Sequence, residues 1–213
     1  MSNQLDFIAP LNCNKCKRLN DFLELQRKKS PYWFNNPVPS FGDINSKVLI
    51  LGLAPGLKGA NATGRPFTGD FAGEVLFSSL SKFGLAENKY NSHINDGLKL
   101  KSVRITNSVK CVPPKNLPTS EEVHNCRIFL ADEIKKMKNL KIVLVLGGIA
   151  HKTFIKFFKL KISSYPFIHG KIFKLPNGIE LVCSYHCSKY NIYTKRLTTE
   201  MFDNIIKKIK LRI

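Results

Sequence analysis

Residues 48–73, VLILGLAPGLKGANATGRPFTGDFAG, join a short apolar run to a long glycine-rich loop. The apolar run, residues 48–51, is typical of a buried parallel strand. The loop ends at a single acid, Asp70, and its glycines are Gly52, Gly56, Gly59, Gly64 and Gly69. Because glycine has no Cβ, backbone amides there can approach a phosphate or a ring closely. A loop of this length after a parallel strand indicates a functional site rather than a simple connection.

Strand and helix patterns alternate along the rest of the chain. Strands are predicted at residues 103–109 and 142–146, and Pro176-Asn177-Gly178 predicts a hairpin between residues 168–175 and 178–184. Helices are predicted at residues 15–29, 72–84, 119–138 and 195–211, and another follows the Gly147-Gly148 turn to about residue 158. The polar residues 84–100 are expected to form a loop.

This alternation predicts a single α/β domain over residues 1–213. The expected fold is a three-layer α/β/α sandwich around a mainly parallel central sheet of four strands. The helix at residues 119–138 opens with Thr119-Ser-Glu-Glu122, a capping box in which the Thr hydroxyl and the Glu carboxylate satisfy exposed amides reciprocally.

The chain carries a large and unevenly distributed positive charge. Its 34 Lys and Arg outnumber its 15 Asp and Glu, giving +19 at pH 7. Residues 1–100 carry 12 basic and 8 acidic side chains, net +4, whereas residues 101–213 carry 22 and 7, net +15. A field of this sign favours a polyanion, most simply nucleic acid, although a Lys-rich surface can also reflect genome composition alone.

Composition also bears on location. No apolar stretch approaches the ~20 residues that a membrane-spanning helix needs. The amino terminus, MSNQLDFIAPLNC, lacks the basic and then apolar order of a signal peptide. The apolar content of 43% excludes a mostly disordered chain. We therefore expect a cytoplasmic protein with no membrane segment.

Four of the six cysteines form a candidate ligand set: Cys13, Cys16, Cys111 and Cys126. In a cytosolic protein such thiols are more often metal ligands than disulfides. Zinc and a 4Fe-4S cluster both accept four thiolates, and the spacing does not separate them. Four independent buried thiols are the third interpretation. Cys183 and Cys187 are interpreted as packing residues.

A second polar segment, SYHCSKYN at residues 184–191, follows the last predicted strand. It should emerge at the same edge of the sheet as the glycine-rich loop, because parallel strands end together. Its His186 would meet Asn107, which lies near the end of the strand at residues 103–109, and Asp70. These three side chains form a candidate site.

Together these segments resemble the family 5, or B-type, uracil-DNA glycosylases. The residues that carry the resemblance are GLAPGLKGANATGRPFTGD, TNSVKCVPP, the four cysteines and His186-x-Ser188-x-x-Asn191. The related family 4 enzymes usually carry Glu where this chain has Leu53, and they lack an acid matching Asp70. One departure is Cys187, because the second motif usually has Pro after its His; loss of that Pro frees the backbone and adds an amide donor.

The resemblance implies a monofunctional DNA glycosylase that acts on uracil in DNA. Hypoxanthine and other deaminated bases are further candidate substrates, and their order is left open. It also implies a 4Fe-4S cluster, rather than zinc, held by Cys13, Cys16, Cys111 and Cys126. We expect a monomer whose partner is DNA.

The resemblance and the side-chain chemistry together assign roles to the catalytic candidates. Asp70 would orient or deprotonate the attacking water, and it can also cap the helix that begins near Ala72. Asn107 would read the base, because a carboxamide donates and accepts at once. His186 would donate to the carbonyl oxygen that becomes negative as the bond breaks, a contribution of ~3 kcal/mol.

The remaining candidates would bind the substrate. Phe67 would stack on the flipped base, although it could also be a core residue under the loop. With Leu53 in place of a polar group, the site would rely on Asp70 and on backbone amides of Ala54 and Gly56. Ser188 and Asn191 belong to the phosphate-binding segment. Three residues are candidates for a wedge that enters the duplex: Tyr190, Ile192 and Tyr193.

Two other functions fit part of the sequence. A non-enzymatic iron-sulfur or zinc nucleic-acid-binding protein would explain the cysteines and the charge, but it would give the three catalytic candidates no purpose. A nucleotide-binding enzyme is the third candidate. Its loop would need a Gly-Lys-Ser/Thr ending or a dinucleotide fingerprint, and the Gly52-x-x-x-Gly56 spacing meets neither requirement.

Overall fold

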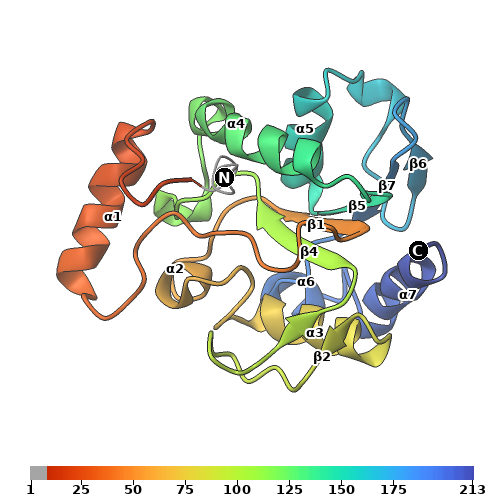
Figure 1. Ribbon diagram of the computed structural model, residues 1–213, viewed down its shortest axis with the longest axis horizontal. Helices are drawn as coiled ribbons and strands as arrows, with labels where there is room; N and C mark the ends of the chain where they lie inside the picture. Colours follow the sequence, from red (N-terminus) through yellow and green to blue (C-terminus); the bar gives the residue numbers. More distant parts are fainter. Residues whose placement is uncertain (1–8) are drawn as a thin grey trace, which may run out of the picture.

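A computed structural model describes residues 9–213 and centres on one five-stranded sheet (Figure 1). The strand order is β4-β1-β5-β7-β6. The strands are β1 (Val48–Gly52), β4 (Val103–Asn107), β5 (Ile142–Leu146), β6 (Ile172–Lys174) and β7 (Glu180–Ser184). The pairs β1·β4, β1·β5 and β5·β7 are parallel, and β6 pairs with β7 in the antiparallel sense. The expected parallel strands are confirmed, and the hairpin strand β6 adds a fifth at the edge.

Helices cover both faces of this sheet, which makes three layers (Figure 1). One face packs against α3 (Phe71–Lys82) and α7 (Thr199–Lys210). The other packs against α4 (Ser120–Lys136) and α5 (Gly148–Phe157). The three-layer α/β/α sandwich predicted from the sequence is therefore confirmed.

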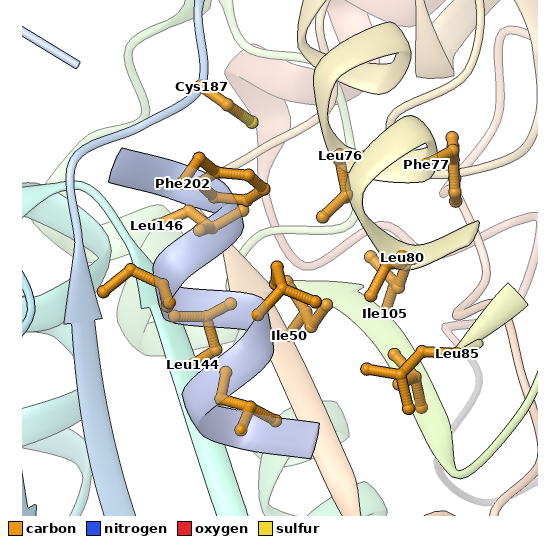
Figure 2. Packing of buried hydrophobic residues seen from close by; sticks show 14 of the residues in the cluster. Ile50, Leu76, Phe77, Leu80, Leu85, Ile105, Leu144, Leu146, Cys187 and Phe202 are labelled. Atoms are coloured by element: carbon orange, nitrogen blue, oxygen red, sulfur yellow. The ribbon is translucent and has the colours of Figure 1, made fainter. Parts of the chain in front are cut away.

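Side-chain alternation along β1 supplies both faces of the core. Val48 and Ile50 belong to the cluster that α3 and α7 complete, whereas Leu49 and Leu51 belong to the cluster on the α4 and α5 face. Figure 2 shows Leu76, Leu80 and Phe202 of the helices meeting Ile50 and Ile105 of the sheet. Burying each such side chain is worth roughly 1.5–3 kcal/mol, so a strand buried on both faces must be apolar throughout.

A third cluster attaches α1 (Lys17–Lys29) beside α4. Leu19 and Leu23 of α1 pack against the segment after β4 and against Phe129 of α4. Arg18 donates two hydrogen bonds to the carboxylate of Glu122, both at 2.7 Å. Within residues 9–213, no helix combines the length and the apolar character that a bilayer crossing requires.

The structure differs from the predicted elements at three places. Residues 84–100 contain a small second sheet of β2 (Ala86–Glu87) and β3 (Lys99–Leu100). The glycine-rich loop contains the short α2 (Ala60–Thr63). The predicted helix at residues 195–211 begins only at Thr199, because Lys195 has a positive φ of 56° and the Thr198 hydroxyl caps the helix by accepting from the Met201 amide.

The remaining short elements lie in connections. They are the 3-10 turns η1 (Pro114–Asn116) and η2 (Ile162–Ser164) and the five-residue α6 (Lys189–Tyr193). The capping box of α4 is confirmed, since Thr119 Oγ1 accepts from the Glu122 amide and Glu122 Oε2 accepts from the Thr119 amide.

Candidate active site

The ends of β1 and β4 bring Gly52 and Asn107 side by side. The two residues are register partners in the parallel pair. A Cβ at Gly52 would lie 2.2 Å from Asn107 Oδ1 and 3.1 Å from Phe67 Cζ, so only glycine fits. Among residues 9–213, no hydrogen bond engages the Asn107 carboxamide, although Asn107 is only 4% exposed. A buried amide without a protein partner, set against an aromatic ring, is suited to a planar polar ligand.

Phe67 is held in an unfavourable backbone conformation beside this amide. Its φ is 54°, in the left-handed region that a bulky residue rarely adopts. The Tyr90 hydroxyl donates to the Phe67 carbonyl at 3.3 Å and accepts from the Gly69 amide at 3.2 Å. A Cβ at Gly73 would lie 1.8 Å from the same carbonyl oxygen. Contacts from several segments therefore fix the Phe67 backbone.

A buried ion pair anchors the segment that carries Tyr90. Both terminal nitrogens of Arg65 donate to the Asp96 carboxylate, at 2.8 and 2.7 Å. These bonds hold the pKa of Asp96 well below its usual range. The Arg65 guanidinium also lies 5.0 Å from the centre of the Phe41 ring and 5.8 Å from that of Tyr90. The sequence provided no signal for this support, because the partners are far apart along the chain.

Asp70 caps α3 with one carboxylate oxygen and faces the glycine-rich loop with the other. Its Oδ1 accepts from the Gly73 amide at 2.9 Å. Its Oδ2 lies where a Cβ at Gly59 would approach to 2.5 Å, and no hydrogen bond within residues 9–213 uses it. The capping role is confirmed, and the second oxygen remains available for a water molecule.

His186 follows β7 and stacks on Phe67. The ring centres are 5.9 Å apart and the planes differ by 25°. Burial lowers the pKa of His186, and the negative charge of Asp70 only partly opposes that shift. The imidazole is therefore neutral at neutral pH and retains one N–H donor. The structure thus brings Asp70, Asn107, Phe67 and His186 together.

The segment after His186 is ordered by its own hydrogen bonds. Asn191 Nδ2 donates to the His186 carbonyl at 2.8 Å, and the Ser188 hydroxyl caps α6 by accepting from the Asn191 amide at 3.4 Å. Both side chains thus hold the loop that presents His186.

Cys187 shows how this loop accommodates the loss of the usual Pro. Its side chain is fully buried and belongs to the cluster drawn in Figure 2. Its thiol donates to the Ala72 carbonyl at 3.4 Å. Cys183 is buried in the other core cluster, so both cysteines are confirmed as packing residues. The Cys187 contact ties the His186 loop to the start of α3, next to Asp70.

The other substrate-binding candidates are distributed between this group and the face of the sheet that α4 and α5 cover. Leu53 lines a cavity between α4 and α5, and Ala54 packs toward the cysteines. A Cβ at Gly56 would lie 3.5 Å from Asp70 Oδ2, so the Gly56 backbone adjoins the carboxylate. Among the wedge candidates, Tyr190 and Tyr193 are 71% and 68% exposed, whereas Ile192 packs against the core.

The four candidate ligand cysteines, from three separate segments of the chain, line one small cavity together. Cys16 precedes α1, Cys126 lies in α4, and Cys111 follows Asn107 by four residues. The Lys110 amide donates to Cys126 Sγ at 3.3 Å. Burial raises the pKa of Cys126 to about 11 and that of Cys111 further. Such thiols become thiolates when bound cations compensate for the loss of solvent.

The arrangement of these thiols bears on the group they would hold. Among residues 9–213, no three His, Cys, Asp or Glu side chains are arranged to hold a single metal ion. Four thiolates on one zinc all lie about 2.3 Å from the same atom. The thiolates of a 4Fe-4S cluster bind different irons and therefore lie farther apart. Four thiols around one cavity match the donor set of either group.

Comparison with known proteins agrees with this geometry. The family described as the uracil DNA glycosylase superfamily matches residues 39–210, and the chain belongs to it. Within it, a type-5 uracil-DNA glycosylase of Thermus thermophilus is 41% identical over 204 residues, covering 93% of this chain and 92% of that protein. A type-5 enzyme of Pyrobaculum aerophilum is 38% identical over 95% of this chain and 90% of its own length. A type-4 enzyme of Archaeoglobus fulgidus is 27% identical over 93% of this chain and 87% of its own length.

Replacing Tyr90 by Phe should loosen Phe67. The variant loses the hydroxyl that bridges Gly69 and Phe67, so the free energy of unfolding should fall by about 1–2 kcal/mol. Chemical denaturation measures this change. Tyr32→Phe is the matched control, because Tyr32 is 98% exposed. Equal stabilities for the two variants would contradict the bridging role.

The pKa of His186 should respond to Asp70. In the native protein, burial keeps the pKa of His186 below its usual value, and Asp70 opposes the shift. Asp70→Asn removes the opposing charge, so the pKa of His186 should fall further. NMR titration of 13C-labelled histidine measures it, with Asp43→Asn as an exposed control. A rise in Asp70→Asn would show that the two groups do not interact as described.

Proposed function

We propose that this chain hydrolyses the N-glycosidic bond of uracil in DNA and leaves an abasic site without cutting the strand. The observation that carries the proposal is the unpaired Asn107 carboxamide, buried beside the Phe67 ring at the edge of the sheet. The similarity to type-5 uracil-DNA glycosylases supports the same reaction.

Asn107 suits a base that presents an N–H next to a carbonyl. A carboxamide donates from Nδ2 to the carbonyl and accepts the N–H at Oδ1. Uracil has this edge, and so does hypoxanthine, whereas cytosine offers the reverse pattern. A base of this type must leave the helical stack to reach the pocket, and Phe67 would stack on it there. The carboxamide therefore suits bases with an N–H beside a carbonyl, the class to which uracil and hypoxanthine belong.

His186 and Asp70 would act on opposite charges of the transition state. As the bond from C1′ to the base nitrogen breaks, its electron pair moves onto the base, and the neutral His186 donates a hydrogen bond to the carbonyl oxygen that gains charge. Asp70 stabilises the cationic sugar, orients water for attack on C1′ and accepts its proton. The base leaves as an anion and is protonated in solvent. Asp70 Oδ2, free of protein partners in residues 9–213, is the oxygen suited to this step.

Cys13, Cys16, Cys111 and Cys126 would hold a 4Fe-4S cluster. When bound, it would cross-link the start of α1, the segment after β4 and α4 through iron–sulfur bonds. Asn107 lies four residues before Cys111, so this cross-link would help to hold the base-reading amide. On this proposal the cluster would have a structural role. The alternative, a non-enzymatic nucleic-acid-binding protein, leaves the Asn107, His186 and Asp70 arrangement without a use.

Tyr190 is the wedge candidate that the contacts favour. Its side chain is 71% exposed. Tyr193 instead packs near Phe71 and under Lys189, with ring and cation distances of 5.9 and 5.4 Å. Ile192 faces the core. A free aromatic side chain next to the His186 loop can fill the space that a flipped base vacates.

Purified protein should release free uracil from a uracil-containing oligonucleotide, with strand cleavage only after alkali. Asp70→Ala should lower kcat about 10²–10⁴-fold, since it removes the group that positions water. Asp43→Ala, an exposed acid elsewhere, should retain the rate. No uracil release by the native protein would overturn the proposed function, and full activity of Asp70→Ala would remove Asp70 from the mechanism.

The native protein should contain iron and show broad visible absorbance. Cys111→Ser should lose both signals, because it removes one of the thiols around the shared cavity. Cys183→Ala should retain them, since Cys183 packs in a different cluster. Elemental analysis and absorption spectra measure the result. One zinc per chain without visible absorbance would contradict the cluster.

A further inference from the structure

A cavity of about 290 Å³ lies between α4 and α5, on the opposite face of the sheet from Asn107. Figure 1 shows these two helices on the same face of the sheet. Successive side chains of β4 point to opposite faces of the sheet. Ile105 belongs to the cluster packed by α3 and α7, whereas Thr106 donates a hydrogen bond to Glu133 of α4. Asn107 accordingly joins the base site, and Ser108 lines the cavity. The two sites are in direct contact: Ser108 lines the cavity, Gly52 adjoins the base site, and Ser108 Oγ donates to the Gly52 carbonyl at 3.2 Å.

The rim of the cavity is basic. Two cationic or titratable side chains come from α4, His124 and Arg127, and two come from α5, Lys152 and Lys156. The members of each pair are three or four residues apart, so they lie on the same side of their helix. No Asp or Glu lines the cavity, and within residues 9–213 no ion pair joins these four side chains to a carboxylate. The rim therefore has unneutralised positive charge.

The remaining lining suits a sugar-phosphate chain. Thr119, Ser120 and Thr153 supply hydroxyl donors for phosphate oxygens, and Ile149 and Phe157 supply apolar surface. The basic surface also continues beyond the cavity. His124 and Arg127 line a second hollow together with Lys15. A track of cations across two neighbouring hollows matches a polymer of phosphates better than a single nucleotide.

We infer that this surface, Lys15, His124, Arg127, Lys152 and Lys156, binds the phosphodiester backbone of the DNA strand that flanks the flipped nucleotide. The inference rests on the proposed function for the position of that nucleotide. On this inference, α4 and α5 form a surface that binds the DNA backbone and that is separate from the base site and from the segment at residues 186–191. Contacts of this kind position the DNA and carry no sequence information.

The test compares two variants with equal charge loss. The surface variant carries Arg127→Gln, Lys152→Gln and Lys156→Gln. The control carries Lys207→Gln, Lys208→Gln and Lys210→Gln at the end of α7. That end lies at the opposite edge of the sheet, because Lys47, just before β1, bonds to the carbonyl of Ile213. Affinity for an undamaged labelled duplex is measured by fluorescence anisotropy from 50 to 200 mM salt.

The surface variant should reduce the slope of log affinity against log salt by about 2–3, since each lost phosphate contact removes about 0.9. The control should keep the native slope. An equal change in both variants, or none in the surface variant, would overturn the inference. If the triple variant unfolds, Lys152→Gln and Lys156→Gln made singly should each lower the slope by about 1; unchanged slopes would again overturn it.

Two further arms separate the outcomes. In the first arm, the duplex is shortened on the 5′ or on the 3′ side of a uracil. For the native enzyme, only one of these two truncations should raise KM. For the surface variant, that same truncation should leave KM unchanged, and kcat should equal the native value. Thymidine monophosphate should not displace DNA; displacement from the native protein but not from the surface variant would indicate a mononucleotide site and overturn the inference. Binding to undamaged DNA does not require excision. If the surface variant and the control differ in binding but the native protein releases no uracil, only the glycosylase proposal is overturned.

Discussion

The close contact at Gly52 is the constraint on which the base site depends. Asn107 Oδ1 and the Phe67 ring both occupy space that a Cβ at position 52 would fill. Since β1 and β4 are in parallel register at this point, their spacing leaves no room for the backbone to move apart. The amide, the ring and the ends of two strands are therefore positioned by the absence of one carbon atom. A close approach that only glycine permits also occurs at Gly59, beside Asp70, and at Gly73, beside the Phe67 carbonyl.

A buried ionic group lies beside the cysteine cavity. Glu133 of α4 is fully buried and pairs with Arg104 at 2.6 Å and with Lys110 at 3.2 Å. Burial alone would raise the pKa of Glu133, but the two cations hold it below its usual value. Lys110 also donates its amide to Cys126. A charge group of this kind tolerates little displacement, because separating the partners leaves uncompensated buried charge.

The electrostatics of the surface and of the base site differ. The chain has a net charge of +19, which attracts DNA over a distance set by the salt concentration. In the base site itself, Asn107 is uncharged, His186 is held neutral by burial, and Asp70 is the single acid of the catalytic group. A general positive field thus gathers the polymer, while a nearly neutral pocket responds to the charge that develops during the reaction.

Local sequence patterns predicted much of the fold. The apolar runs became β1 and β5, the hairpin signal became β6 and β7, and the Thr119 capping box formed as expected. These features depend on neighbouring residues, so the sequence contains their full physical cause. The resemblance to a known family also singled out Asp70, Asn107, Phe67 and His186, which the fold then placed at one edge of the sheet.

Long-range contacts decided the rest. Tyr90 braces Phe67, and Arg65 pairs with Asp96, through bonds that span 23 and 31 residues. The cation track across α4 and α5 likewise depends on how two helices pack on one face. From sequence alone we could place the chemical groups along the chain and predict their class of site. Only the folded chain could show which backbone is held strained, which carboxylate oxygen stays free and which cations share a surface, because these properties belong to distances in space rather than to spacing along the polymer.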